Sequence, residues 1–182
     1  MTKFDLPFIE DIDVEDLPTL REGYRYELHG GSLVIMTPAT FWHRLIQRRI
    51  YDMLRAAGQN AFQDPGVLGD RPRDNRLPDV AVITELPAGK PTKTYSNLPG
   101  SFYLLVVEVV SENSPNGEHT DKMAWYAERG IPEYWIADES PSRPDDAMVQ
   151  VYVLAGGGKA AYAHERTILL SELEKEYQAE SI

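Results

Sequence analysis

The stretch Phe102–Val110, FYLLVVEVV, decides the fold of this 182-residue chain. Apart from Glu108, all of its residues are aromatic, leucine or valine, which is typical of a strand buried on both faces near the centre of a sheet. A carboxylate in such a strand is costly to bury unless it is paired, hydrogen-bonded or bound to a metal ion. From this strand alone two interpretations stay open. Glu108 belongs to a functional site, or it points outward at a sheet edge or pairs with a buried arginine.

Downstream of this strand, the sequence predicts one helix and two more strands. A polar loop leads into a helix of about Glu118–Arg129. The runs Glu133–Asp138 and Met148–Leu154 are rich in β-forming residues and predict strands. The glycines at 156–158 lack the strand–glycine–helix context of a nucleotide-binding loop, so they predict a hairpin turn. The tail from Leu169 predicts a short acidic helix.

Upstream, the same patterns predict a hairpin, a helix and further strands. The runs YRYELH and SLVIM flank Gly30-Gly31, a two-residue turn signal, so Tyr24–Met36 predicts a β-hairpin. A helix of about Thr40–Ala57 follows, capped by Thr37 or Thr40. The later elements are a strand at Asn60–Leu68 interrupted near Pro65-Gly66, a turn-rich basic stretch with Arg71, Arg73 and Arg76, a strand at Leu77–Thr84, and a surface loop at 85–101.

The order of these elements is hairpin, helix, strands, helix and strands. It predicts an α/β (α+β) fold, in which a mixed β-sheet is flanked by helices and preceded by an N-terminal β-hairpin. A chain of this length can bury a sizeable core, so we expect a single domain over residues 1–182. Within it, residues 1–20 are an acidic lead-in segment and residues 171–182 a C-terminal tail.

The composition narrows the chemistry that the chain can support. It has no cysteine, which excludes disulfides, thiolate zinc sites and cysteine nucleophiles. A metal ion would be held by carboxylates, histidines or backbone oxygens, and carboxylate oxygens suit Mg²⁺ or Mn²⁺. No apolar run approaches the ~18 residues of a membrane span, and the acidic N-terminus lacks the pattern of a signal peptide, so we expect a cytoplasmic protein. A net charge of −11 counts against nonspecific coating of nucleic acid, which relies on neutralising phosphates.

Three further charged residues stand out beside Glu108. Asp79 opens the apolar run VAVI, although an aspartate after a proline is more often a turn residue. Glu27 lies on the polar face of the predicted hairpin, which usually points to solvent. Lys122 lies early in the helix that follows, where most lysines are solvated. As a set, carboxylates that bind a hard cation and a lysine that offsets negative charge suit hydrolysis of a phosphate ester. Their spacing alone does not establish that they converge.

Four segments of the chain occur in a characteristic order: YRYELHGGSLVIMTP, LPDVAVI, VVEVVSENS and DKMAWYAERGIPEYWIAD. Together they resemble the Uma family, bacterial proteins that are named as restriction endonucleases and assigned to the PD-(D/E)xK nuclease superfamily. The resemblance runs from about Tyr24 to Leu154 and is carried by the set rather than by any one motif. It implies a restriction-endonuclease-like core and metal-dependent cleavage of DNA.

The resemblance also implies a role for each of the four charged residues. Asp79 matches the acidic residue of the superfamily's PD and Glu108 matches its (D/E), both as ligands of Mg²⁺, with Mn²⁺ as the other option. Glu27 matches the family's N-terminal acidic residue, which implies a further metal ligand or a group that orients the water, and Lys122 matches the lysine. The chain departs from the superfamily pattern at the lysine. In that pattern the lysine lies two residues after the acidic residue, but the residue two positions after Glu108 is Val110. In this family the lysine lies on the following helix, where Lys122 stands.

Other side chains are candidates for contacts with the substrate. They lie in or near the predicted helices and the basic stretch, and they are His43, Arg44, Gln47, Arg76 and Tyr126. Imidazole, amide, phenol and guanidinium groups all bind phosphate or sugar oxygens. For each of them an ordinary structural or solvated role is the alternative.

The leading hypothesis is a Mg²⁺-dependent endonuclease that hydrolyses phosphodiester bonds of DNA. Nucleases that cut both strands often work as dimers, so the hypothesis is compatible with a homodimer by analogy only. The hypothesis requires that Lys122 reach Asp79 and Glu108. One alternative is a non-catalytic binding or regulatory module on the same fold, which the net charge and the displaced lysine favour. The other is a metal-dependent hydrolase of a small phosphorylated molecule.

Overall fold

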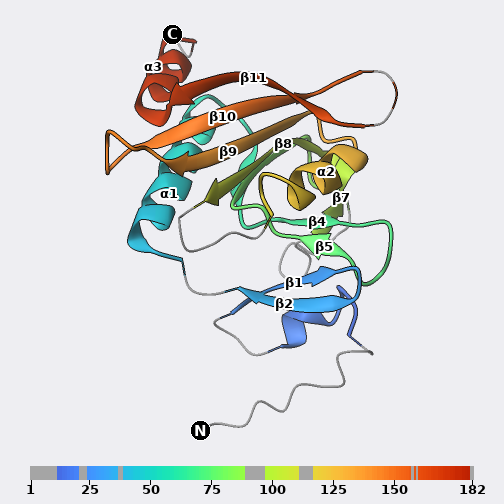
Figure 1. The fold of residues 1–182 in the computed structure, drawn as a ribbon. Helices are drawn as coiled ribbons and strands as arrows, with labels where there is room; N and C mark the ends of the chain where they lie inside the picture. Colours follow the sequence, from blue (N-terminus) through green and yellow to red (C-terminus); the bar gives the residue numbers. More distant parts are fainter. Residues whose placement is uncertain are drawn as a thin grey trace, which may run out of the picture.

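The computed structural model describes residues 12–20, 24–36, 39–88, 97–110, 117–156, 158 and 160–180. Figure 1 shows a central sheet with helices packed on it and a two-stranded hairpin below. The elements are η2 (Leu17–Thr19), β1 (Arg25–His29), β2 (Ser32–Met36), α1 (Phe41–Ala56), β3 (Ala61–Gln63), β4 (Gly66–Leu68), β5 (Asn75–Arg76), β6 (Val80–Ile83), β7 (Asn97–Pro99), η3 (Gly100–Phe102), β8 (Tyr103–Val110), α2 (Asp121–Glu128), β9 (Glu133–Glu139), β10 (Ala147–Leu154), β11 (Tyr162–Leu169) and α3 (Leu170–Glu180).

The central sheet has six strands in the order β11-β10-β9-β8-β6-β3. The strands β8 and β9 are parallel, while the other neighbouring pairs are antiparallel. The connection from β8 to β9 carries α2, since a parallel pair needs a crossover. This mixed sheet, its helices and the β1–β2 hairpin confirm the predicted fold class. The predicted central strand is confirmed as well, because β8 lies between β9 and β6.

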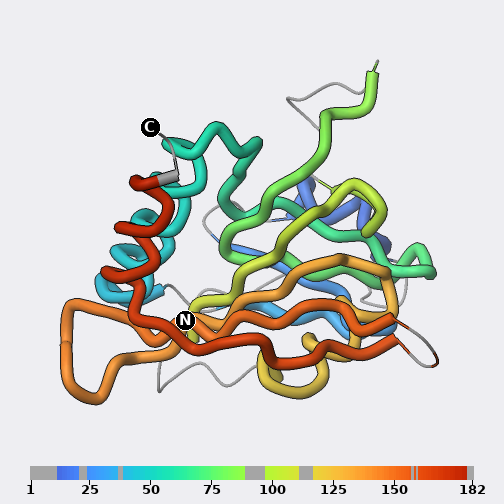
Figure 2. Tube along the Cα trace, turned by 90° about the horizontal axis from the view of Figure 1, so that it is seen from above, coloured from blue at the N-terminus to red at the C-terminus, as the bar shows by residue number. Residues whose placement is uncertain are grey.

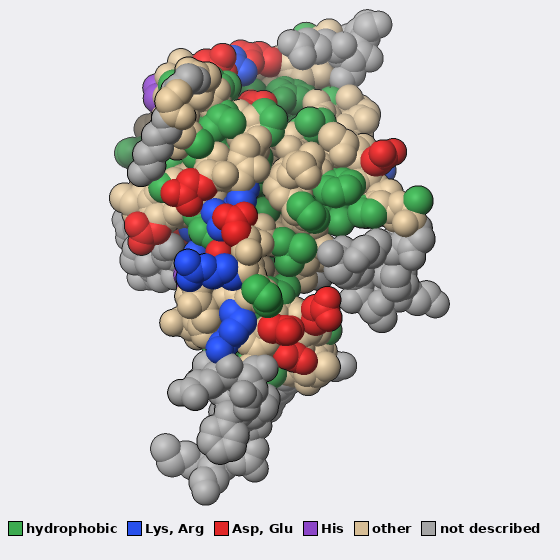
Figure 3. All heavy atoms as spheres, turned by 90° about the vertical axis from the view of Figure 1, so that its right-hand side faces the viewer, with side chains coloured by type: hydrophobic (Ala, Val, Ile, Leu, Met, Phe, Trp, Pro, Cys, Tyr) green, Lys and Arg blue, Asp and Glu red, His purple; other side chains and the backbone are tan. Residues whose placement is uncertain are grey.

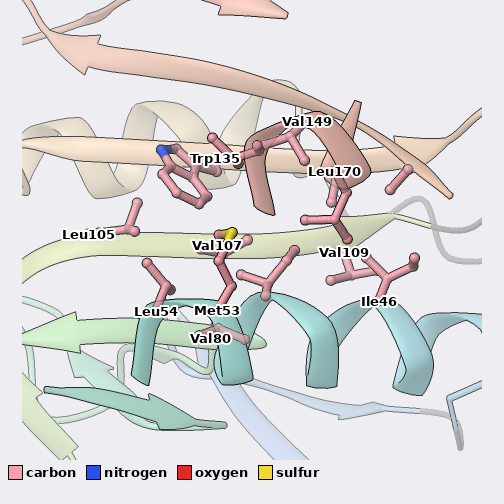
Figure 4. Close-up of a cluster of buried hydrophobic side chains, with 14 of the residues drawn as sticks. Ile46, Met53, Leu54, Val80, Leu105, Val107, Val109, Trp135, Val149 and Leu170 are labelled. Carbon is pink, nitrogen blue, oxygen red and sulfur yellow. The ribbon is translucent and has the colours of Figure 1, made fainter. Parts of the chain in front are cut away.

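One face of the sheet packs against α1 and α3, which lie side by side in both views of the chain trace (Figures 1 and 2). Alternate residues of a strand face the same way. Leu105, Val107 and Val109 of β8 therefore all point to this side. There they belong to one buried cluster with Ile46 and Leu54 of α1 (Figure 4). This apolar layer anchors α1 to the centre of the sheet.

The helix α1 begins and ends close to where the sequence predicts. Thr40 Oγ1 accepts a hydrogen bond from the backbone N–H of His43 at 3.2 Å and so caps the helix. Beyond its end, Gly58 has a φ of +77°, the left-handed conformation that commonly terminates helices. Thr37, the other predicted cap, lies outside the described residues. The cap fixes the first turn of α1 and thereby orients His43.

The opposite face of the sheet packs against α2 and a small sheet in the order β5-β4-β7. Val106 of β8 and Tyr134 of β9 share a buried cluster here with Trp125 and Tyr126 of α2. The central strand β8 is therefore covered on both faces. Among the described residues, no helix has both the length and the apolar character that crossing a membrane requires.

Some strands differ from the prediction. The predicted strand Asn60–Leu68 is divided at Pro65, which cannot donate to a ladder: β3 joins the large sheet and β4 the small one. The strands β5 and β7 lie in segments predicted as a turn-rich stretch and a surface loop. Both are too short to show a periodic apolar pattern, and they form by pairing with β4. After the predicted glycine turn, β11 pairs antiparallel with β10. Residues 157 and 159 of that turn lie outside the described residues.

The hairpin and the N-terminal segment form a further cluster. Tyr26 and Leu28 of β1 are buried with Ile12, Val14 and Leu17. The part of the predicted lead-in that is described, residues 12–20, thus packs on the hairpin, and residues 1–11 lie outside the described residues.

One buried carboxylate joins the hairpin, β5 and α2. Asp74 accepts hydrogen bonds from Gly30 N at 3.2 Å, Arg76 Nη1 at 3.0 Å, Trp125 Nε1 at 2.9 Å and Arg129 Nη2 at 3.2 Å. The guanidinium of Arg129 also lies 3.5 Å from the ring centroid of Trp125. The hairpin and α2 are therefore held in place by the same group.

Candidate functional site

Glu108 points from the apolar strand β8 toward α2. Its side chain is buried, with 3% of the residue exposed. The Tyr126 hydroxyl donates to Glu108 Oε1 at 2.7 Å, and Lys122 Nζ lies 3.3 and 3.2 Å from the two carboxylate oxygens. The carboxylate that interrupts the apolar strand is thus buried and paired with residues of α2.

Asp79 lies beside Glu108 at the start of the neighbouring strand. The strands β6 and β8 are antiparallel, with Val80 opposite Val107. Continuing this register by one residue places Asp79 opposite Glu108, and directly opposite residues of an antiparallel pair share one face. The two carboxylates therefore project on the same side of the sheet.

Three groups hold the Asp79 carboxylate. Its Oδ2 accepts a hydrogen bond from Val109 N at 2.8 Å and lies 3.2 Å from His43 Nε2. Its Oδ1 accepts one from Arg25 Nη1 at 3.1 Å. The aspartate is thereby tied to β8, α1 and the hairpin at once.

Glu27 reaches the same place from the hairpin and is 1% exposed. Its Oε1 accepts a hydrogen bond from Leu77 N at 2.8 Å, and its Oε2 lies 2.6 Å from His29 Nε2. Lys122 Nζ lies 3.7 Å from Oε1. The polar face of the hairpin, predicted from alternation, thus packs against the segment before β6 instead of pointing to solvent.

Lys122 is the residue at which these groups meet. It lies in the first turn of α2, and only 2% of it is exposed. Its ammonium contacts Glu108 at 3.2 Å, Glu27 at 3.7 Å and Glu118 Oε1 at 3.7 Å. Asp79 is the residue opposite Glu108, so the four side chains converge. Lys122 is therefore buried beside the carboxylates rather than solvated, while the catalytic roles of the four residues stay a prediction.

The cluster carries more negative than positive charge. Burial raises the pKa of Glu108 to about 8; the Lys122 ammonium opposes this rise, while Asp79, Glu27 and Glu118 add to it. Burial lowers the pKa of Lys122, but the charges of the same carboxylates outweigh burial, so its pKa is raised and it stays an ammonium. The surplus negative charge favours uptake of a proton or a cation here.

Asp79 and Glu27 stay ionised at neutral pH. Burial raises the pKa of each carboxyl group, but favourable partners outweigh it. For Asp79 these partners are His43, by hydrogen bond and charge, and Arg25, by charge. For Glu27 the largest is the hydrogen bond with His29. The pKa of both carboxyl groups is therefore lowered, in contrast to that of Glu108.

A family model described as "Putative restriction endonuclease", Uma2, matches residues 12–179. The chain belongs to the Uma2 family. The resemblance carried by the four sequence segments is thereby confirmed. No curated protein gives a significant match to this Uma2 chain.

A solved structure with the same arrangement supports the fold. It is described as a "putative nuclease belonging to DUF820" from Anabaena variabilis. The Uma2 chain is similar to it with a TM-score of 0.60 and 13% sequence identity, over 94% of this chain and 99% of that one. The likeness at this identity concerns the fold alone.

Three of the predicted substrate residues lie at the cluster of the Uma2 protein. Gln47 Nε2 donates to the backbone carbonyl of Asp79 at 2.8 Å, one helical turn after His43. Tyr126 donates to Glu108. His43, Gln47 and Tyr126 are all buried. Their contacts with a substrate stay a prediction, while their contacts with the carboxylates are part of the fold.

The two predicted arginines lie outside the cluster itself. Arg44 is exposed on another side of α1. Arg76 is buried, donates to the Leu28 carbonyl at 3.1 Å and lies 4.7 Å from the ring centroid of Trp125. The geometry gives Arg76 a structural role between the hairpin and α2, and its predicted phosphate contact stays untested.

Sequence reasoning missed Arg25 and Asp64. Arg25 Nη2 lies 2.9 Å from Asp64 Oδ1, so its guanidinium bridges Asp64 and Asp79. Asp64 has a φ of +53°, which is uncommon outside glycine, and its N–H donates to the Asp79 carbonyl at 3.1 Å. Two signals could have found them. Arg25 shares a strand face with Glu27, and Asp64 precedes a proline that interrupts a strand.

Within the described ranges, no three histidine, aspartate or glutamate side chains lie close enough together to hold a metal ion by themselves. Asp79, directly before β6, and Glu108 in the adjacent strand β8 form a pair of carboxylates. The positive groups next to them are Arg25 and Lys122. The site as described therefore combines two candidate ligands with two resident cations.

Proposed function

We propose that this Uma2 protein is a divalent-metal-dependent endonuclease that hydrolyses DNA phosphodiester bonds at the cluster of Glu27, Asp79, Glu108 and Lys122. The position of Lys122 carries the proposal, since a nearly fully buried ammonium lies 3.2 Å from the Glu108 carboxylate. Burying several charged groups together is expensive, and such groupings mark functional sites. The family description and the nuclease-like neighbour support the same class of reaction.

Asp79 and Glu108 would hold Mg²⁺, or Mn²⁺ in its place. The donor set fits, because both residues supply hard oxygens and Mg²⁺ is usually bound through one or two carboxylates together with waters. Burial, and after it the charge of the neighbouring carboxylates, raises the pKa of Glu108, and the negative charge of those carboxylates fits a cation as well. When bound, such an ion lowers the pKa of a water and offsets the charge that builds on the phosphate.

Hydrolysis requires a water oxygen to attack phosphorus while the bond from phosphorus to the leaving sugar oxygen breaks. The water gives up a proton and the leaving oxygen gains one, so the products are a phosphate monoester and an alcohol. Lys122, with three N–H donors, offsets negative charge on the phosphate oxygens in the transition state. Glu27, which is held ionised, orients the water and accepts its proton. Tyr126 fixes the Glu108 carboxylate.

Cleavage of supercoiled and linear duplex DNA, with Mg²⁺, Mn²⁺ or EDTA, tests the proposal. The wild type should cut only with metal, and Lys122→Met and Asp79→Asn should each cut at least about 10²-fold more slowly, as is typical for removal of a group that stabilises transition-state charge. Lys175→Met removes an exposed lysine of α3 and serves as the matched control. Absence of cleavage by the wild type with either metal would refute the proposal.

A non-catalytic binding module is the second candidate, and one observation favours it. Arg25 and Lys122 already pair with the carboxylates, so the cluster is partly neutralised without a metal ion. This candidate predicts that no nucleic acid is cut. It also predicts that calorimetry detects no binding of Mg²⁺ or Mn²⁺ that depends on Asp79 and Glu108. The wild type and the double variant Asp79→Ala/Glu108→Ala should therefore give the same result.

A further inference from the structure

We propose that the exposed face of α1 is the surface on which duplex DNA docks. This inference rests on the proposed function and adds where the substrate lies relative to the site. It concerns a row of three arginines, Arg44, Arg48 and Arg55, and two exposed apolar residues, Phe41 and Leu45. We call these five residues the α1 face.

The charge of α1 runs against that of the whole chain. The helix carries four arginines and one aspartate, a net charge of +3, in a protein whose net charge is −11. Asp52 is its only acidic residue, so the first eleven residues of α1 carry none. A duplex is a polyanion, and its phosphates bind where positive charge is concentrated. Within an acidic protein, α1 is therefore a suitable place for a nucleic acid.

The arginine row lies beside the candidate site. Successive residues of a helix are turned by about 100°. His43 and Gln47 are one turn apart on the side of α1 that contacts Asp79. Arg44 and Arg48 each follow one of them by one residue, so they occupy the adjoining side of the same two turns. A phosphate strand bound to this row would run alongside the carboxylate cluster.

The arginines of the row are available to a ligand, in contrast to the remaining arginine of α1. Arg48 has 77% of its side chain exposed, and its pair with the exposed Asp52, at 3.4 Å, is of the weak surface kind. Arg49 instead lies 2.8 Å from Glu174 and 3.4 Å from Asp146, and it ties α1 to α3 and the β9–β10 connection. Arg49 is thus structural.

Apolar side chains border the arginine row. Phe41 is 93% exposed and Leu45, one turn further on, 44%. Exposed apolar side chains rimmed by charge mark contact surfaces. An exposed phenylalanine can insert at a base step in the minor groove, while the arginines bind the flanking phosphates. The combination fits a duplex better than a purely polar partner.

The side of the molecule away from α1 offers a contrast. Figure 3 shows that Asp and Glu side chains there lie among Lys and Arg side chains, over the part of that side that is described. Interspersed charges of both signs repel a phosphate backbone as much as they attract it. The charge distribution therefore favours the α1 face.

Binding of a fluorescent duplex in EDTA, measured over a range of salt, tests the inference without cleavage. Arg44→Ala/Arg48→Ala should weaken binding at least about tenfold and lower the slope of log affinity against log salt by about two. Phe41→Ala should weaken binding with the slope unchanged. Arg143→Ala/Arg166→Ala removes two exposed arginines outside α1 and is the matched control.

Equal binding by the α1 double variant and the control would overturn the inference. If the wild type still cut DNA in that case, the proposed function would stand. A wild type that neither bound nor cut any duplex would refute both the docking surface and the proposed function. Sedimentation of the same variants gives an independent check, since a dimer lost specifically on Phe41→Ala would identify the α1 face as a contact between two copies and overturn DNA docking.

Discussion

Replacing Glu108 with glutamine should stabilise the fold at pH 8 while it abolishes cleavage. In the folded state the pKa of Glu108 is about 8, against an ordinary value of 4.5, chiefly because the group is buried. A raised carboxyl pKa means that the folded state binds the proton more tightly than the unfolded state does. This contribution to stability is fully present below pH 4.5 and is lost as the pH rises toward 8.

The size of the effect follows from the two pKa values. One pKa unit corresponds to about 1.4 kcal/mol, so between pH 5.5 and pH 8 the wild type should lose about 3 kcal/mol that the uncharged glutamine does not lose. The group is almost fully buried, so solvent does not screen this difference. In the variant, Lys122 keeps Glu27 and Glu118 as partners. The stability gap between Glu108→Gln and the wild type should therefore widen by about 3 kcal/mol toward pH 8.

Urea unfolding in EDTA at pH 5.5 and pH 8 measures this gap, and both values stay above the isoelectric point of about 4.8. Glu172→Gln changes an exposed glutamate of α3 and should show no widening. Addition of Mg²⁺ at pH 8 should narrow the gap, because a bound cation stabilises only the wild type. A gap that is equal at the two pH values, or a variant that is less stable at pH 8, would refute the electrostatic reasoning.

Further predictions concern the lysine, the Asp74 carboxylate and the tyrosine. Adding Val110→Lys to Lys122→Met places an ammonium two residues after the β8 glutamate, on the same strand face, and should restore cleavage at least tenfold over the single variant; no gain would show that the helical position itself is needed. Asp74→Ala should lower the free energy of unfolding by about 3–5 kcal/mol in urea, because it leaves buried guanidinium groups without their partner. The control Asp70→Ala, at a side chain that is 85% exposed, should lower the free energy of unfolding by under about 1 kcal/mol. Equal losses for the two variants would contradict the role of Asp74 in holding the hairpin and α2. Tyr126→Phe should cost about 1–3 kcal/mol at pH 8 and keep the fold by circular dichroism, and an unchanged stability would argue against the hydrogen bond to the β8 carboxylate.

Local patterns were enough for the main elements and for one residue of the site. Four elements were predictable from such patterns, because the hairpin has a strong turn signal and the others, α1, β8 and β9, have a clear apolar pattern. Glu108 was predictable for the same reason, since a carboxylate is conspicuous in an apolar strand. The register of β6 on β8, which sets Asp79 opposite Glu108, was not readable from either strand alone.

The rest of the site depends on contacts between distant segments. Glu27 is buried only because the hairpin packs against residues 50 positions further along the chain. Alternation puts Arg25 on the same strand face as Glu27, but it does not show that this face meets Asp64 and Asp79. The short strands β5 and β7 exist because β4 lies beside them, which no local pattern encodes.

The four hydrogen bonds to Asp74 have a consequence for how the molecule opens. Their donors belong to the hairpin turn, β5 and α2, so neither the hairpin nor α2 can detach without breaking bonds to the carboxylate that also holds the other. Local unfolding proceeds in cooperative units, and the hairpin and α2 should therefore form one unit whose backbone amides exchange with solvent together. Glu27 and Lys122 lie in that unit, so we expect local unfolding to remove the two residues from the site together.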